Sequence, residues 1–237
     1  MSDVYTLIPA QGSNVLIVAD HASAHVPDDI DLGVAPSALT QHIAIDIGVA
    51  AVARLLCDRT GCGAVLAGVS RLVIDLNREA DAPGLIPQES DGHIIRGNVD
   101  IDRQERIDRF YRPYHAAISE ALDGIAQPFI LSLHSFTPAL SSRAEDRPWH
   151  VGILYNRDDR AARIAIPMLE VAGLNVGDQL PYSGTILNAT MNRHAEARGI
   201  PYPGVEMRQD LVSDAAGQSQ FADYLVPVLD ACRNALA

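Results

Sequence analysis

Short runs of branched apolar residues alternate along the chain with longer segments in which apolar residues recur every three or four positions. The short runs are typical of buried strands, and the three-to-four-residue period is typical of amphipathic helices. Their alternation predicts an α/β fold built from βαβ units around a mostly parallel or mixed sheet. The expected strands are Val15–Ala19, Ala64–Ala67, Leu72–Leu76, Phe129–Leu133, His150–Tyr155 and Gly204–Met207.

Four segments with helical periodicity lie between these strands. They are expected near Ser37–Leu56, Asp100–Leu122, Asp158–Val171 and Ser213–Ala235. Each begins at a Ser or Asp, whose side chain can accept hydrogen bonds from the free N–H groups of a first helical turn. Two other segments, 80–98 and 177–203, show no periodicity and are rich in Gly, Pro and Asn. Long irregular loops in compact domains usually act as lids or binding loops, so both are expected to border a site.

Composition narrows the class of protein. A chain of 237 residues suits one α/β domain, so residues 1–237 are expected to form a single catalytic domain. The net charge is -12 and no block of basic residues occurs, which argues against nucleic acid or an anionic membrane as partner. Cys57, Cys62 and Cys232 form no CxxC pair or even set, and neither a signal peptide nor an apolar run of ~20 residues is present. These features predict a cytoplasmic protein.

Polar side chains gather where the predicted strands end. If the strands are parallel, their carboxyl ends meet at one edge of the sheet, which is where ligands bind in open α/β folds. A lone loop histidine is usually satisfied by backbone or water, but the recurrence of polar clusters at four strand ends favours a functional site. The residues concerned are His21, Asp75, Asn77, Arg78, His134 and Glu206.

A further carboxylate, Asp46, falls inside the predicted helix HIAIDIGVAAVARLL among apolar neighbours. Burying an unpaired charge costs several kcal/mol, so a cation must lie beside it. A metal shared with His21 and an ion pair with Arg71 or Arg78 are both open.

His21, Asp46 and His134 make up the two-histidine, one-carboxylate set of hydrolytic zinc sites, which acidify a water to a pKa of ~7. No HExxH, GxSxG, Walker A or GxGxxG motif is present. Hydrolysis by metal-activated water is therefore favoured over serine hydrolase, nucleotide-binding and dehydrogenase chemistry.

Five stretches in order, namely DHAS, the Asp46 segment, SRLVIDLNRE, LHSF and GVEMRQDL, resemble the N-formylglutamate amidohydrolase family over nearly the whole chain. The resemblance implies a three-layer α/β/α fold of the zinc-exopeptidase type and a zinc-dependent hydrolase of histidine degradation. It implies that His21, Asp46 and His134 bind zinc, that Glu206 activates the water and acts with Arg78 in catalysis, and that Asn77 and Arg78 clamp the substrate. The chain departs from the family where it reads Asp20-His21-Ala22-Ser23 instead of Pro-His-Ser-Gly, and Ala44-Ile45-Asp46-Ile47 instead of Asp-Thr-Asp-Trp.

The expected reaction is hydrolysis of an N-acyl bond on a small anionic amino-acid derivative, with N-formyl-L-glutamate giving formate and L-glutamate. Arg78, with Arg71, Arg193 and Arg208, would hold substrate carboxylates, because a guanidinium binds a carboxylate with two parallel hydrogen bonds. For Arg193 and Arg208, a solvated position or an ion pair with Asp75 or Asp210 is the alternative.

Three other interpretations stay open at the level of sequence. Glu206 would pair with Arg208 if both point to the same face of a strand. The enzyme would act on another N-acyl group or a peptide-like substrate, or the fold would serve as a binding module without turnover. A binding module has no need of a strand-end carboxylate such as Glu206 beside a metal.

Overall fold

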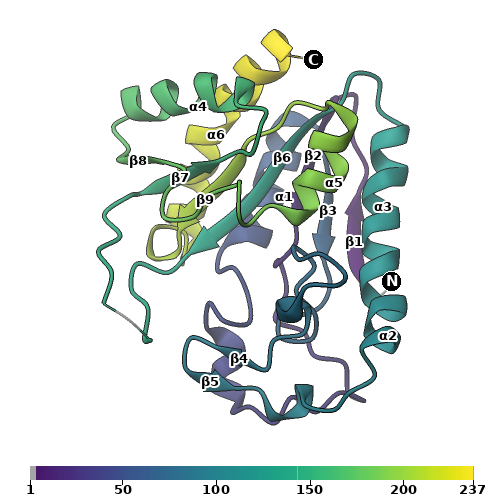
Figure 1. The fold of residues 1–237 in the computed structure, drawn as a ribbon. Helices are drawn as coiled ribbons and strands as arrows, with labels where there is room; N and C mark the ends of the chain where they lie inside the picture. Colours follow the sequence, from purple (N-terminus) through teal and green to yellow (C-terminus); the bar gives the residue numbers. More distant parts are fainter. Residues whose placement is uncertain (1–3, 143, 237) are drawn as a thin grey trace.

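The computed structural model describes residues 4–142 and 144–236. A seven-stranded sheet forms its centre, in the order β1-β3-β2-β6-β9-β7-β8 (Figure 1). The strands are β1 (Tyr5–Ile8), β2 (Val15–Ala19), β3 (Gly63–Ala67), β6 (Phe129–Phe136), β7 (Val151–Leu154), β8 (Val176–Asp178) and β9 (Gly204–Arg208). A separate hairpin is formed by β4 (Glu89–Ser90) and β5 (His93–Ile94).

The sheet is mixed, with a parallel centre. Strands β3, β2, β6 and β9 run parallel, while β1 pairs antiparallel with β3 and β7 pairs antiparallel with β9. The carboxyl ends of β2, β6 and β9 therefore lie side by side at one edge of the sheet. This is the edge that the strand-end residues of the sequence predicted as a site.

Helices cover both faces of the sheet, which makes three layers. Successive residues of β2 point to opposite faces, so Val15, Ile17 and Ala19 enter one core and Leu16 and Val18 the other. Helices α1 (Val49–Thr60), α4 (Arg160–Val171) and α6 (Ala215–Leu236) pack in the first core. The second core contains α3 (Arg112–Asp123) and α5 (Ala189–His194). The predicted three-layer α/β/α fold is confirmed.

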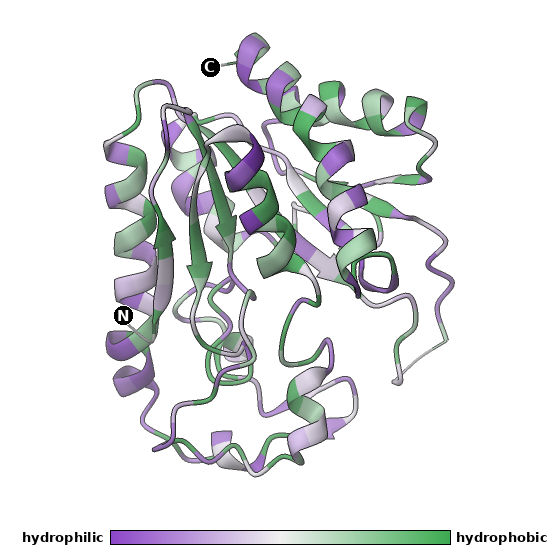
Figure 2. Cartoon of the chain, turned by 180° about the vertical axis from the view of Figure 1, so that it is seen from behind, coloured by the Kyte–Doolittle hydropathy of each residue, from purple (hydrophilic) through white to green (hydrophobic). Residues whose placement is uncertain are grey.

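The remaining helical turns are short. Helix α2 (Arg103–Arg106) runs through a π-helical turn, Ile107–Tyr111, into α3, so one continuous helix spans 103–123 and starts three residues later than the predicted Asp100. Single 3₁₀ turns occur at Pro36–Thr40, Pro83–Leu85, Arg96–Asn98, Glu196–Arg198 and Gln209–Leu211. Figure 2 shows apolar residues along the strands and mixed polar and apolar residues along the helices, as expected for helices with one face on a sheet. None of the helices in the described part is both long and apolar enough to cross a membrane.

The predicted strand Leu72–Leu76 is wrong. This segment forms turns whose apolar side chains are fully buried. Its backbone is paired with side chains instead of a neighbouring strand: Asn98 Nδ2 donates to Leu72 O at 2.8 Å, and Arg106 Nη1 donates to Val73 O at 2.7 Å. Ser70 Oγ also accepts from Leu72 N at 3.2 Å. In the sequence this run resembles a buried strand because its side chains are apolar. Its backbone carbonyls are bound by polar side chains from elsewhere in the chain.

The predicted helix Ser37–Leu56 is also wrong over its first half. Helix α1 begins only at Val49, so Asp46 lies in the loop before a helix and not within it. Gly48 precedes the helix with a φ of 82°, a conformation that favours glycine. A Cβ at this position would lie 2.3 Å from Val212 O, so the close approach of a distant loop also requires glycine here.

Strands β1 and β8 and the hairpin β4–β5 were not predicted. Each has only two to four residues per strand, which is too short for a clear period. Strand β6 is longer than predicted, so His134 lies inside the strand and not after it.

Candidate active site

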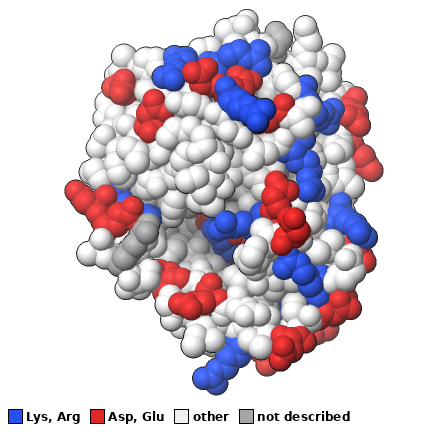
Figure 3. Space-filling view, in the orientation of Figure 1, with Lys and Arg blue, Asp and Glu red and all other residues white. Residues whose placement is uncertain are grey.

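A cavity of about 170 Å³ opens at the carboxyl ends of β2, β6 and β9. Figure 3 shows a hollow on this face of the molecule with basic side chains inside it and acidic ones nearby. The predicted site residues that line the cavity are His21, Asp46, Arg71, Asn77, Arg78, His134 and Glu206. Arg193 and Arg208 do not line it.

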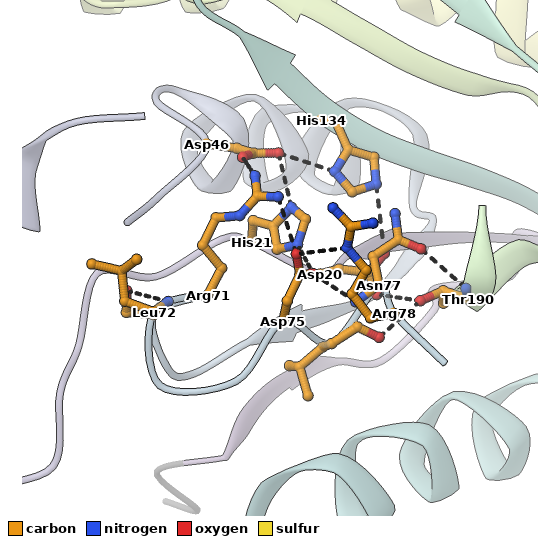
Figure 4. Close-up of polar contacts among 12 residues, drawn as sticks. Asp20, His21, Asp46, Arg71, Leu72, Asp75, Asn77, Arg78, His134 and Thr190 are labelled. Atoms are coloured by element: carbon orange, nitrogen blue, oxygen red, sulfur yellow. Dashed lines mark hydrogen bonds and ion pairs between the residues drawn. The ribbon is translucent and has the colours of Figure 1, made fainter. Parts of the chain in front are cut away.

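The three predicted metal ligands meet in this cavity. Asp46 Oδ2 lies 3.3 Å from His21 Nδ1 and 3.0 Å from His134 Nδ1 (Figure 4). One potential ligand atom from each residue lies within 4.8 Å of the others, and all three side chains are buried. Imidazole nitrogens with a carboxylate oxygen are a donor set that suits zinc. The group formed by His21, Asp46 and His134 could therefore hold a metal ion.

Each histidine of this group also faces a carboxylate with its other nitrogen. His21 Nε2 lies 2.7 Å from Asp75 Oδ1, and His134 Nε2 lies 3.5 Å from Asp20 Oδ2. Metal-ligating histidines commonly donate their second N–H to a carboxylate, which fixes the ring and its tautomer. The sequence marked Asp75 only as a strand-end residue and a possible ion-pair partner of an arginine, and it assigned no role to Asp20. The only local signal was their position, directly before His21 and two residues before Asn77.

Arg71 is held by the carboxylates of the site. Its Nη1 donates to Asp46 Oδ1 at 3.1 Å, and its Nη2 donates to Asp75 Oδ2 at 3.2 Å. The ion pair with Arg71 and a metal shared with His21 are therefore compatible, because one oxygen of Asp46 faces the histidines and the other faces Arg71. Both terminal nitrogens of Arg71 have partners within the protein, and this favours an electrostatic role over substrate contact.

The charges at the cavity leave room for a cation. Four buried carboxylates, Asp20, Asp46, Asp75 and Glu206, lie near the histidines, and two arginines, Arg71 and the partly exposed Arg78, oppose them. Among the described residues, Glu206 Oε2 is a buried oxygen with no hydrogen-bond partner. An orphaned buried carboxylate oxygen is costly, and a cation in the cavity would offset that cost.

The pKa values reflect this crowding. Burial alone would raise the pKa of Asp46, but the charges and hydrogen bonds of His21, His134 and Arg71 hold it below the ordinary range. Burial raises the pKa of Glu206 to about 7, against the opposing effect of His134. A carboxyl group with a pKa near 7 can both accept and release a proton at neutral pH.

The Asn77-Arg78 pair presents donors to the cavity. Asn77 Oδ1 accepts the backbone N–H of Thr190 at 3.0 Å, so its NH₂ group is left for a ligand (Figure 4). Arg78 Nε lies 3.4 Å from Asp75 Oδ2, and its terminal nitrogens make no ion pair with any residue that the structure describes. Arg78 therefore has a free guanidinium edge at the cavity, in contrast to Arg71.

Most of the chain matches one known protein family. The family model of N-formylglutamate amidohydrolase matches residues 13–213 of the chain. The chain belongs to the N-formylglutamate amidohydrolase family. As a member of this family, it is a hydrolase that acts on amide bonds.

Solved structures agree with this membership. A gene product of Agrobacterium tumefaciens, Atu2144, is 30% identical with a TM-score of 0.90, over 98% of this chain and 95% of that one. An N-formylglutamate amidohydrolase from Ralstonia eutropha JMP134 has the same fold, with 22% identity and a TM-score of 0.78, over 99% of this chain and 98% of that one. A comparison with curated proteins found no match.

Arg193 and Arg208, which the sequence suggested as substrate ligands, lie outside the cavity. Arg208 binds Asp210 with two nitrogens, at 2.8 and 3.2 Å, so it pairs with Asp210 and not with Glu206. Arg193 lies 5.1 Å above the ring of Tyr111, in a separate cleft between α3 and α5. The tertiary structure thus turns both arginines away from the cavity.

His42 and Tyr182 also line the cavity, and neither was assigned a role from the sequence. His42 Nε2 lies 3.1 Å from Asp91 of the β4–β5 turn, and Tyr182 accepts a hydrogen bond of 3.0 Å from Arg147. Asp91 and Tyr182 belong to the irregular segments 80–98 and 177–203. Those segments do border the site, but nothing in their composition marked individual residues.

Proposed function

We propose that the protein is a zinc-dependent amidohydrolase that removes the acyl group from an N-acyl acidic amino acid, with N-formyl-L-glutamate as the substrate. The observation that carries this proposal is the convergence of His21 Nδ1, His134 Nδ1 and Asp46 Oδ2 beside Glu206 in one cavity. His21, His134 and Asp46 would hold the zinc. Zinc in such a site polarises a carbonyl and lowers the pKa of a water to ~7.

Glu206 is the proton carrier of the proposed reaction. Its carboxylate accepts a proton from the attacking water and delivers it to the nitrogen of the departing amino acid, so that formate and a free amine result. Its place on the same cavity wall as His134 supports this role, because the two residues are paired across β6 and β9. The orphaned Oε2 atom is available for the water.

Arg78 and Asn77 bind the substrate in this proposal. The free guanidinium edge of Arg78 grips a carboxylate with two hydrogen bonds, and the Asn77 NH₂ group donates to a substrate oxygen. Together with His21, Arg71 favours the ionised forms of Asp46 and Asp75, and it adds positive charge to the cavity. The positive charge of the arginines can attract a small anionic amino-acid derivative to the cavity, although the protein as a whole carries a net charge of -12. We expect the protein to be cytoplasmic and to bind such a ligand. We expect neither nucleic acid nor a membrane as a partner.

The proposal is tested with purified protein. Bound metal is measured first, and formate release is then followed with N-formyl derivatives of glutamate, aspartate and leucine and acetate release with N-acetyl-glutamate. Turnover that needs zinc and prefers formyl-glutamate supports the proposal. Equal rates with formyl-leucine would rule out the role of Arg78 as a carboxylate clamp, and faster acetate release would indicate a different acyl group. Stoichiometric zinc without turnover of any of these compounds would favour a binding module.

A further inference from the structure

A buried carboxylate outside the metal group, Asp20, lies behind His134. By contrast, arginines of the cleft between α3 and α5 are paired with acids, as in Arg198–Asp123 at 2.6 Å and Arg193–Glu79 at 3.6 Å. Asp20 follows the last residue of β2, and its side chain has no exposed surface. Its contacts come from three distant elements.

The first oxygen of Asp20 is fixed by two hydroxyl donors. Tyr114 Oη of α3 and Thr190 Oγ1 of α5 each lie 3.0 Å from Asp20 Oδ1, and the Thr190 hydroxyl also lies 3.2 Å from a second acceptor, Leu76 O. All three residues are buried, so no water competes for these contacts. Two donors on one oxygen set the plane of the carboxylate and leave Oδ2 for another partner.

The second oxygen faces His134. Asp20 Oδ2 lies 3.5 Å from His134 Nε2 (Figure 4). Within the described residues, both atoms are buried and neither has another hydrogen-bond partner. The opposite nitrogen of the same ring, Nδ1, faces Asp46 Oδ2 at 3.0 Å. Each of the two orphaned atoms thus has the other as its natural partner.

We propose that Asp20 is a positioning residue that keeps the hydrogen of His134 on Nε2, so that the Nδ1 lone pair is directed at the metal group. The inference rests on the proposed function, because it assumes that His134 binds zinc. Asp20 touches neither substrate nor metal in this proposal and acts only through the ring of His134. Its effect is on the tautomer and orientation of a ligand, as for other carboxylates behind metal-bound histidines.

The variant Asp20→Asn isolates this role. Asparagine keeps Oδ1 as the acceptor for Tyr114 and Thr190, but it places an NH₂ group where Oδ2 faced His134. A donor opposite Nε2 forces the hydrogen of the neutral ring to Nδ1, which removes the lone pair directed at the metal. The matched control is Tyr114→Phe, which removes one donor from Oδ1 and leaves Oδ2 and His134 unchanged.

Two measurements without substrate test the proposal. The zinc dissociation constant, from competition with a chelator, should rise about 10–100-fold in Asp20→Asn and stay within about 2-fold of the parent in Tyr114→Phe. Nitrogen-15 NMR of the zinc-loaded parent should show the ring hydrogen of His134 on Nε2. That spectrum keeps the proposal open to refutation even if Asp20→Asn does not fold.

Two results would overturn the proposal. One is a ring hydrogen on Nδ1 of His134 in the zinc-loaded parent. The other is a zinc affinity that does not separate the two variants, either because folded Asp20→Asn keeps the affinity of the parent or because Tyr114→Phe loses as much as Asp20→Asn. Failure of the parent to bind zinc would instead contradict the proposed function itself, so the two failures are distinguishable.

Discussion

His134 and Glu206 are direct partners in the register of the parallel strands β6 and β9. Residues in register on adjacent strands point to the same face of the sheet, so a candidate ligand and a candidate base lie side by side on two central strands. Strands in the middle of a sheet hold side chains more accurately than loops do. The relative placement of His134 and Glu206 is therefore fixed by the backbone pairing of the sheet.

The metal group makes a prediction about zinc content and stability. His21→Ala and His134→Ala should each lose stoichiometric zinc, because each removes one of three protein ligands. At free zinc of 100 times the dissociation constant, the parent should gain about 2.7 kcal/mol of unfolding free energy, and neither variant should gain. Metal analysis and thermal unfolding with and without chelator check this. Full zinc content in either variant would contradict the ligand assignment.

Glu206→Gln tests the proton carrier. The amide keeps the shape of the side chain but cannot accept the proton, so kcat should fall by a factor on the order of 10²–10⁴. Zinc content and melting temperature should stay close to those of the parent. If the variant loses zinc, or if its remaining activity follows the folded fraction, Glu206 is a ligand or a structural residue.

Arg78→Lys tests the clamp while the charge is kept. The ammonium group cannot form two parallel hydrogen bonds to a carboxylate, so kcat/KM for formyl-glutamate should fall at least about 10-fold, mainly through KM. Arg208→Lys is the matched control, because Arg208 pairs with Asp210 outside the cavity, and its kinetics should match those of the parent. Equal kinetics of the two variants would refute the clamp.

The histidine pair behind α3 predicts how stability depends on pH. His115 Nδ1 and His194 Nε2 lie 2.9 Å apart, and burial lowers their pKa values to about 3 and about 4 from an ordinary 6.5. The folded chain therefore binds these protons less readily than the unfolded chain. Their contribution to stability is complete above pH 6.5 and is lost as the pH falls toward these folded values.

Between pH 6.5 and about 4, each of these histidines should remove about 1.4 kcal/mol of unfolding free energy per pH unit. Urea unfolding of the parent and of His194→Gln over this range measures the difference. As the pH falls, the unfolding free energy of His194→Gln should decrease by about 1.4 kcal/mol less per pH unit than that of the parent. Parallel curves for the two proteins would mean that His194 is already protonated in the folded state.

Much of the fold followed from local pattern. The apolar runs that became β2 and β6 were visible in the sequence because a strand buried on both faces is mostly apolar. The rule that carboxyl ends of parallel strands meet placed His21, His134 and Glu206 at one edge. Local pattern thus determined the α/β class and the edge at which the site lies, and the family resemblance added the three layers.

Only the tertiary structure decided how the remaining site residues are held. Asp46 lies in the loop before α1, where it meets His134 from 88 residues away, and Asn77 is oriented by the backbone of Thr190, 113 residues away. Asp20 meets its hydroxyl partners over 94 and 170 residues. These contacts join buried polar groups that leave no periodic pattern along the chain. Each is stabilised because an unpaired polar group in the core is costly, and which partner satisfies it depends on the packed structure as a whole.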